Sequence, residues 1–185
     1  MKILIIVDMQ KDFIDGALGT KEAVAILPNV IKRVQESDGE MILFTKDTHG
    51  EDYLSTPEGK KLPVKHCIKG TDGWEINEGI LEAMNNNKNT VLVADALGNV
   101  FEKDSFGSTA LVDFLKNLHG EGAAIEEIDL VGICTDICVV ANAILLKTYL
   151  PSVEISVIKD CCAGTSPLAH IEAINTMKNC QINII

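Results

Sequence analysis

The sequence predicts an α/β fold, a single-domain three-layer sandwich with a mainly parallel, Rossmann-like sheet of about six strands flanked by helices. Two observations predict it. Short apolar runs rich in β-branched residues alternate with amphipathic stretches of helical length along the whole chain. Strands that alternate with helices favour a parallel sheet covered on both faces. The length of 185 residues fits one domain, so residues 1–185 are expected to form a single unit.

The apolar runs are expected to be strands because continuous β-branched runs are typical of strands buried on both faces. The first, KILIIVD, shows this best, since five apolar residues separate Lys2 from Asp8. The expected strands are 2–8, 41–47, 90–95, 128–135, 153–160 and 181–185.

The intervening stretches carry apolar residues at helical spacing, and several have terminal signals. Gly120 closes one helix, Pro151 stops another, and Pro167 falls in the first turn of the last. The expected helices are 21–36, 75–86, 108–120, 135–150 and 166–179.

Composition excludes some partners. The formal net charge of -11 opposes binding to nucleic acid or to an anionic membrane, so a small-molecule partner is expected. The apolar run after Lys2 is too short for a signal peptide or a membrane span. A cytoplasmic location is therefore expected, with the six cysteines reduced. Homo-oligomerisation is left open.

Polar residues follow the expected strands at their carboxyl ends, where open α/β sheets bind ligands. Asp8 ends the first strand, and Asp47 and His49 end the second. Lys103 is expected just past the third strand, and Cys138 in the first turn of the helix after the fourth. The sequence thus places a candidate site at this edge.

Cys138 is the candidate nucleophile. A helix N-terminus lowers the pKa of a thiol and leaves backbone N–H groups free to bind an oxyanion. Cys134 is the rival, expected to be buried at the strand end and to contribute a backbone N–H. The alternative for either is a buried structural cysteine.

Asp8 and Lys103 are the candidate partners of that thiol. A carboxylate after an apolar run is expected to have a raised pKa, which suits proton transfer. A nearby lysine would stabilise the thiolate. The alternatives are a strand-end salt bridge for Asp8 and a solvated loop lysine for Lys103.

Two of the four histidines fall in one loop region with two carboxylates, namely Asp47, His49, Glu58 and His66. This donor set suits one divalent cation, zinc first, with iron or manganese as alternatives. The alternative is an aspartate that caps a loop. His119 and His170 lie in helical stretches and are expected to be structural.

Five segments, in this order, resemble the isochorismatase-like cysteine hydrolases, and particularly the nicotinamidases, across the whole chain. They are IVDMQKDF (6–13), DTH (47–49), LPVKHCIKGTDGWE (62–75), KDSF (103–106) and GICTDICV (132–139). The resemblance implies one isochorismatase-like hydrolase domain over residues 1–185.

The resemblance also implies roles. It makes Asp8, Lys103 and Cys138 a catalytic triad, with the N–H groups of Cys134 and Cys138 as the oxyanion hole after a cis Ile133–Cys134 bond. It assigns Asp47, His49 and His66 to a metal site, with Glu58 as a ligand in one branch of the family. Phe13 matches a residue that stacks on the substrate ring.

The implied activity is hydrolysis of nicotinamide to nicotinate and ammonia through a thioester, as in NAD salvage. One departure is Leu62, which stands where nicotinamidases often carry a second aromatic residue; Phe106 or Trp74 could replace it. Phe13, Leu62 and Phe106 are the expected substrate-binding residues. The alternatives are hydrolysis of another small amide or carbamoyl compound, with or without metal, and a non-catalytic metal- or thiol-binding protein.

Overall fold

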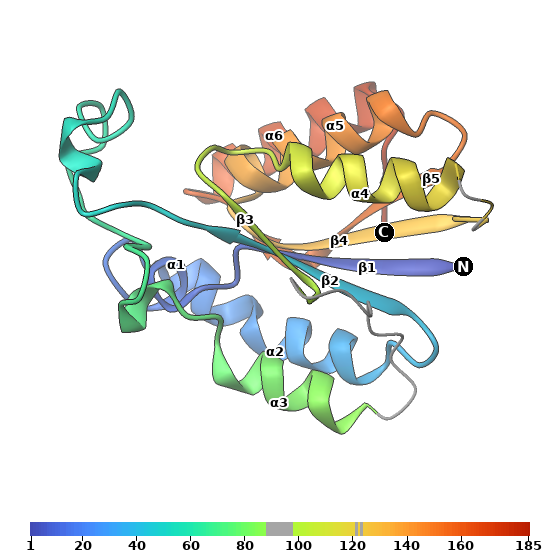
Figure 1. Ribbon diagram of the computed structural model, residues 1–185, viewed down its shortest axis with the longest axis horizontal. Coiled ribbons are helices and arrows are strands. Elements are labelled where there is room, and N and C mark those ends of the chain that lie inside the picture. Colours follow the sequence, from blue (N-terminus) through green and yellow to red (C-terminus); the bar gives the residue numbers. More distant parts are fainter. Residues whose placement is uncertain (88–97, 121, 123) are drawn as a thin grey trace.

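The computed structural model of the protein describes residues 1–87, 98–120, 122 and 124–185 (Figure 1). Within these ranges six strands form one sheet in the order β3-β2-β1-β4-β5-β6, and every neighbouring pair is parallel. Helices cover both faces, which confirms the predicted fold class. The strand expected at 90–95 lies outside the described residues.

Five of the strands match expected ones closely, and one further strand, Val100–Lys103, was not predicted. Lys103 is the last residue of that strand and pairs with Asp47 of its neighbour. That strand is only four residues long and partly polar, so its sequence carries little signal. The strands are β1 (Lys2–Val7), β2 (Met41–Asp47), β3 (Val100–Lys103), β4 (Glu127–Ile133), β5 (Glu154–Ala163) and β6 (Asn183–Ile184).

The helices also follow the sequence pattern. The helix expected from residue 135 instead opens with a π-helical turn, in which the Val139 N–H donates to the Cys134 carbonyl at 3.1 Å. The helices are α1 (Lys11–Ile14), α2 (Lys21–Gln35), α3 (Glu78–Asn86), α4 (Thr109–Gly120), α5 (Val140–Tyr149) and α6 (Pro167–Asn179). Short turns lie at Tyr53–Ser55 (η1), Asp72–Trp74 (η2) and Thr135–Val139 (η3).

Strand β1 shows how the layers are built. Its alternate side chains enter two different cores, Ile5 on one face of the sheet and Leu4 and Ile6 on the other. Helices α2 and α3 cover one face, and α4, α5 and α6 cover the other (Figure 1). No helix in the described part of the chain has the length and apolarity needed to span a bilayer.

The sheet fixes where a site can form. Strand β1 lies between β2 and β4, so the strand order reverses there and leaves a crevice at the carboxyl ends. Gly132 near the end of β4 brings the two central strands together: its φ is 125°, and a Cβ there would meet the Val7 carbonyl. The expected gathering of polar residues at this edge is found.

Candidate active site and metal centre

Three buried side chains meet at the carboxyl edge of the sheet, and we call them the thiol half of the site: Asp8, Lys103 and Cys138. They come from the end of β1, the end of β3 and the π-helical turn after β4. Lys103 Nζ lies 2.7 Å from Asp8 Oδ2 and 3.6 Å from Cys138 Sγ. The three residues that the sequence singled out separately are therefore in contact.

The charges in the thiol half depend on one another. Burial raises the pKa of Asp8, and Lys103 opposes that rise. For Lys103, burial lowers the pKa, but the charges of Asp8, Cys138 and Asp47 outweigh it and raise the pKa overall. Lys103 is therefore a permanent cation beside a carboxylate that is more basic than an ordinary one.

Cys138 differs from the sequence-based expectation of a lowered thiol pKa. Burial, the charge of Asp8 and a hydrogen bond to that carboxylate raise the pKa of Cys138 well above its usual value. The helix dipole is outweighed because the thiol is almost fully removed from water. The resting thiol therefore keeps its proton, and Lys103, which contacts both the sulfur and the carboxylate, links Cys138 to Asp8.

Two neutral side chains hold the thiol half in place. Thr45 Oγ1 donates to Asp8 Oδ1 at 2.6 Å, so one carboxylate oxygen faces a hydroxyl and the other faces Lys103. Asn142 Nδ2 donates to the Cys138 carbonyl at 2.8 Å, and its Oδ1 accepts from the Ser108 N–H at 2.9 Å. Both residues are buried.

The backbone before Cys138 has the expected unusual geometry, since the Ile133–Cys134 peptide bond is cis. Cys134 is half-buried rather than fully buried, and burial raises the pKa of its thiol to about 12. It is therefore a neutral thiol near the nucleophile, without the contacts to Lys103 and Asp8 that Cys138 makes.

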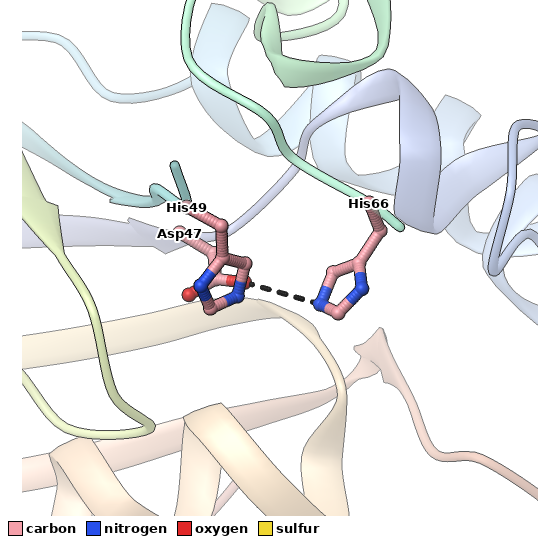
Figure 2. A group of neighbouring side chains, drawn as sticks. All are labelled: Asp47, His49 and His66. Carbon is pink, nitrogen blue, oxygen red and sulfur yellow. Dashed lines mark ion pairs between the residues drawn. The ribbon is translucent and has the colours of Figure 1, made fainter. Parts of the chain in front are cut away.

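A second group at the same edge, which we call the metal half, consists of Asp47, His49 and His66. Their ligand atoms all lie within 4.8 Å of one another. Asp47 Oδ2 is 3.0 Å from His49 Nε2 and 3.5 Å from His66 Nε2. Figure 2 shows the two imidazoles and the carboxylate turned toward a common point.

The donor atoms fit a divalent cation. His66 Nδ1 lies 2.9 Å from the Val64 carbonyl, and when it donates there Nε2 keeps a lone pair for a metal. His49 Nε2 is buried and has no hydrogen-bond partner among the residues that the structure describes. A buried, unpartnered imidazole nitrogen beside a carboxylate is expected where a cation completes the group.

Glu58 lies at the rim of the metal half. Its Oε1 is 3.9 Å from His49 Nε2 and 4.0 Å from His66 Nε2, and its side chain is 27% exposed. Glu58 is therefore near both imidazoles but outside the group of three whose ligand atoms lie within 4.8 Å of one another.

Asp47 joins the two halves. Its Oδ2 faces the imidazoles, whereas its Oδ1 lies 3.5 Å from Lys103 Nζ. Burial favours the neutral form of Asp47, but the neighbouring imidazoles of His49 and His66 and the charge of Lys103 lower its pKa well below the usual range. The carboxylate is therefore ionised, which is the form that binds metal ions.

Both halves open into one cavity of about 330 Å³. All three expected substrate-binding residues line it, together with donors from each half: Phe13, Leu18, Thr20, Asp47, Glu58, Leu62, His66, Phe106, Cys134, Ile137, Cys138 and Thr165. Trp74 does not line it, because its ring lies under Lys46 Nζ at 3.1 Å and its Nε1 donates to Thr48. Phe106 is thus the second aromatic residue at the cavity.

Sequence reasoning missed several supporting residues. Thr45 lies inside an apolar strand, and Gln10 lies two residues past Asp8. Neither residue type indicates, from the sequence, which group its side chain will bind. The Tyr53 ring packs against both imidazoles, tilted to His49 with ring centroids 4.6 Å apart and edge-on to His66 with ring centroids 4.9 Å apart. Only its aromatic character in the loop between the two histidines could have suggested this contact.

Known proteins are similar to this chain in sequence and in fold. The nicotinamidase/pyrazinamidase of Mycobacterium tuberculosis is 25% identical over 202 residues, which cover 100% of this chain and 98% of that protein. The solved pyrazinamidase/nicotinamidase from Streptococcus mutans is 28% identical, with a TM-score of 0.80 and complete coverage of both chains. The pyrazinamidase of Pyrococcus horikoshii in complex with zinc is 28% identical, with a TM-score of 0.75, and the match covers 100% of this chain and 98% of that one.

The family assignment covers nearly every residue. Residues 2–185 match the isochorismatase domain. This range includes all the residues of the thiol half and of the metal half. The chain therefore belongs to the isochorismatase family.

Proposed function

We propose that residues 1–185 act as one domain, a hydrolase of linear amides that converts nicotinamide to nicotinate and ammonia. One observation carries the proposal: the Cys138 thiol, in contact with a lysine that is paired with a buried carboxylate, lines the same cavity as Asp47 and His66. The curated and solved relatives named nicotinamidase or pyrazinamidase support the same activity.

The first half-reaction forms a thioester. Asp8 takes the proton of Cys138, and the sulfur attacks the amide carbonyl carbon. The N–H groups of Cys134 and Cys138 bind the oxyanion that develops. The C–N bond then breaks as the nitrogen takes the proton from Asp8, and ammonia leaves. Lys103 stays charged throughout and stabilises the thiolate, 3.6 Å away in the resting site.

The second half-reaction releases the acid. Water gives a proton to Asp8 and attacks the thioester carbonyl, and the C–S bond breaks as the proton returns to sulfur. The enzyme is restored with nicotinate as product. Asp8 suits both steps because burial makes it more basic than an exposed carboxylate.

Asp47, His49 and His66 would hold the cation, with Glu58 at its rim. A bound zinc, iron or manganese would supply a ligand position for a ring nitrogen and so orient the substrate. Phe13 and Phe106 would contact the ring of the substrate, and Leu62 would form part of the cavity wall. We also propose a cytoplasmic place for the enzyme in nicotinamide salvage.

A second candidate is hydrolysis of another small amide of the same size. The observation that favours it is Leu62, an aliphatic residue on a cavity wall where an aromatic one would stack on a ring. The two candidate functions differ in whether the enzyme recognises the ring nitrogen of nicotinamide. Benzamide tests this, because it has the shape of nicotinamide but lacks that nitrogen.

The test is ammonia release from nicotinamide, benzamide, pyrazinamide and biuret, with hydroxylamine added to trap a thioester as the hydroxamate. We expect nicotinamide to be the best substrate and nicotinoyl hydroxamate to form. Equal rates with nicotinamide and benzamide would favour the second candidate. Hydrolysis without any hydroxamate, and without an acyl group on Cys138 by mass spectrometry, would rule out the thioester route.

A further inference from the structure

Gln10 is a buried amide that the mechanism above does not use. Its Nε2 donates to the Asp47 carbonyl at 2.8 Å and to the Trp74 carbonyl at 2.9 Å. Its Oε1 accepts from the Asp47 N–H at 2.7 Å. One side chain therefore binds both backbone polar groups of a residue that joins the metal half to the thiol half.

The position of Gln10 explains why a side chain is needed there. The β1–β2 pairing ends at Val7 and Thr45, so Asp47 extends two residues beyond the last pair. On its other side Asp47 pairs with Lys103 of β3. Gln10 supplies, on the β1 side, the two hydrogen bonds that a longer strand would have made.

The same contacts fix the backbone from which the Asp47 carboxylate projects. A residue whose N–H and C=O are both bound cannot rotate about its backbone without breaking a buried hydrogen bond. From this backbone the Asp47 Oδ2 lies 3.0 Å from His49 Nε2, and its Oδ1 lies 3.5 Å from Lys103 Nζ. Residues that orient metal ligands typically change metal affinity by about 10–100-fold when removed.

We infer that Gln10 is the positioning residue of the metal half: its amide fixes the backbone of Asp47 and thereby sets the affinity of the site for a divalent cation. This inference rests on the proposed metal site. It assigns Gln10 no contact with the reacting atoms.

Asn142 provides a matched control. It is also a buried amide that binds backbone groups on both of its ends, but those groups are the Cys138 and Phe106 carbonyls and the Ser108 N–H. We expect its replacement to remove similar hydrogen bonds beside Cys138 without a change at Asp47, His49 or His66. The two amides can therefore be compared directly.

The experiment titrates zinc into chelator-stripped full-length protein by calorimetry, for the wild type, Gln10→Met and Asn142→Leu. We expect Gln10→Met to bind zinc about 10–100-fold more weakly, with iodoacetamide labelling of Cys138 within twofold of wild type. We expect Asn142→Leu to keep the zinc affinity and to change the labelling rate. Thermal unfolding in chelator reports any general loss of stability, which a merely structural role would produce without a change in affinity.

The outcomes separate this inference from the proposed function. If the wild type binds one equivalent and Gln10→Met binds equally well, the inference is wrong and the proposed function stands. If the wild type binds no divalent cation, both the metal site and the inference are overturned. If Gln10→Met does not fold, Gln10→Glu, which keeps the acceptor and loses both donors, is judged by the same criterion. If neither folds, Gln10 serves the fold and the inference is overturned.

Discussion

The thiol half and the metal half share a cavity but differ in what completes them. In the thiol half the charges of Asp8 and Lys103 form an ion pair at 2.7 Å, and Lys103 Nζ lies 3.6 Å from the Cys138 sulfur. In the metal half two imidazoles surround one carboxylate, and His49 Nε2 lacks a hydrogen-bond partner in the described structure. The protein itself supplies both the anion and the cation of the first half, whereas the donor atoms of the second half fit a cation from outside the protein.

This difference indicates a division of labour. A set of groups that balance one another can move a proton without outside help, so the thiol half is suited to bond making and breaking. A set with an open coordination position is suited to holding a ligand. Asp47 is in contact with both, 3.0 Å from His49 Nε2 and 3.5 Å from Lys103 Nζ.

The largest effect is expected from Cys138→Ala. Loss of the nucleophile should lower kcat by about 10⁴-fold or more, because the remaining groups cannot form the covalent intermediate. Zinc affinity, measured by calorimetry, should stay within a few-fold of wild type, since this thiol is not in the metal half. Retention of more than a tenth of the wild-type kcat would eliminate the covalent mechanism.

His49→Ala should produce the opposite pattern. Removing one of three ligands should lower zinc affinity by about 100-fold or more and raise the KM for nicotinamide. Iodoacetamide labelling of Cys138 should change less than threefold. Steady-state kinetics and labelling followed by peptide mass spectrometry measure the two effects. A parallel fall in labelling would mean that the two halves act as one.

Thr45→Val sharpens the description of the thiol half. The hydroxyl donates to Asp8 Oδ1, and a hydrogen bond to the ionised form of a carboxylate lowers its pKa. Its removal should raise the pKa of Asp8 further and move the acidic limb of the kcat/KM profile to higher pH. A loss of about tenfold in kcat/KM is expected from one hydrogen bond to a charged group. If the acidic limb does not move, it reports the ionisation of a group other than Asp8.

The smallest effect is expected from Leu62→Ala on the cavity wall. Leu62 is 37% exposed, so truncation loses only part of its contact with substrate. We expect about 1 kcal/mol, or about fivefold in KM, with kcat unchanged. Steady-state kinetics with nicotinamide check this. A large fall in kcat would show that Leu62 contributes to the chemistry and not only to the wall.

The sequence was most informative where backbone topology alone positions residues. Asp8 and Asp47 end apolar runs, and parallel strands place such residues at one edge. Cys138 follows β4, so the same rule placed it near them. The sequence could not predict that Lys103 lies on a strand, because β3 is short and partly polar.

Contacts made by neutral side chains were beyond the sequence. Thr45 and Gln10 bind partners 37 residues away in the chain, and nothing in a threonine or a glutamine specifies such a partner. The pKa of Cys138 was predicted in the wrong direction because burial outweighs the helix dipole, and the depth of burial depends on tertiary packing.

The division of labour is tested most directly by the ratio of kcat/KM for nicotinamide to that for benzamide, measured on metal-loaded and chelator-stripped protein. The two amides present the same carbonyl to Cys138 and differ in the ring nitrogen. We expect the loaded protein to prefer nicotinamide by at least about tenfold, equivalent to about 1.4 kcal/mol, and the stripped protein to lose that preference while Cys138 stays reactive toward iodoacetamide. An equal preference in both forms would contradict the account, because substrate recognition would then not depend on the metal half.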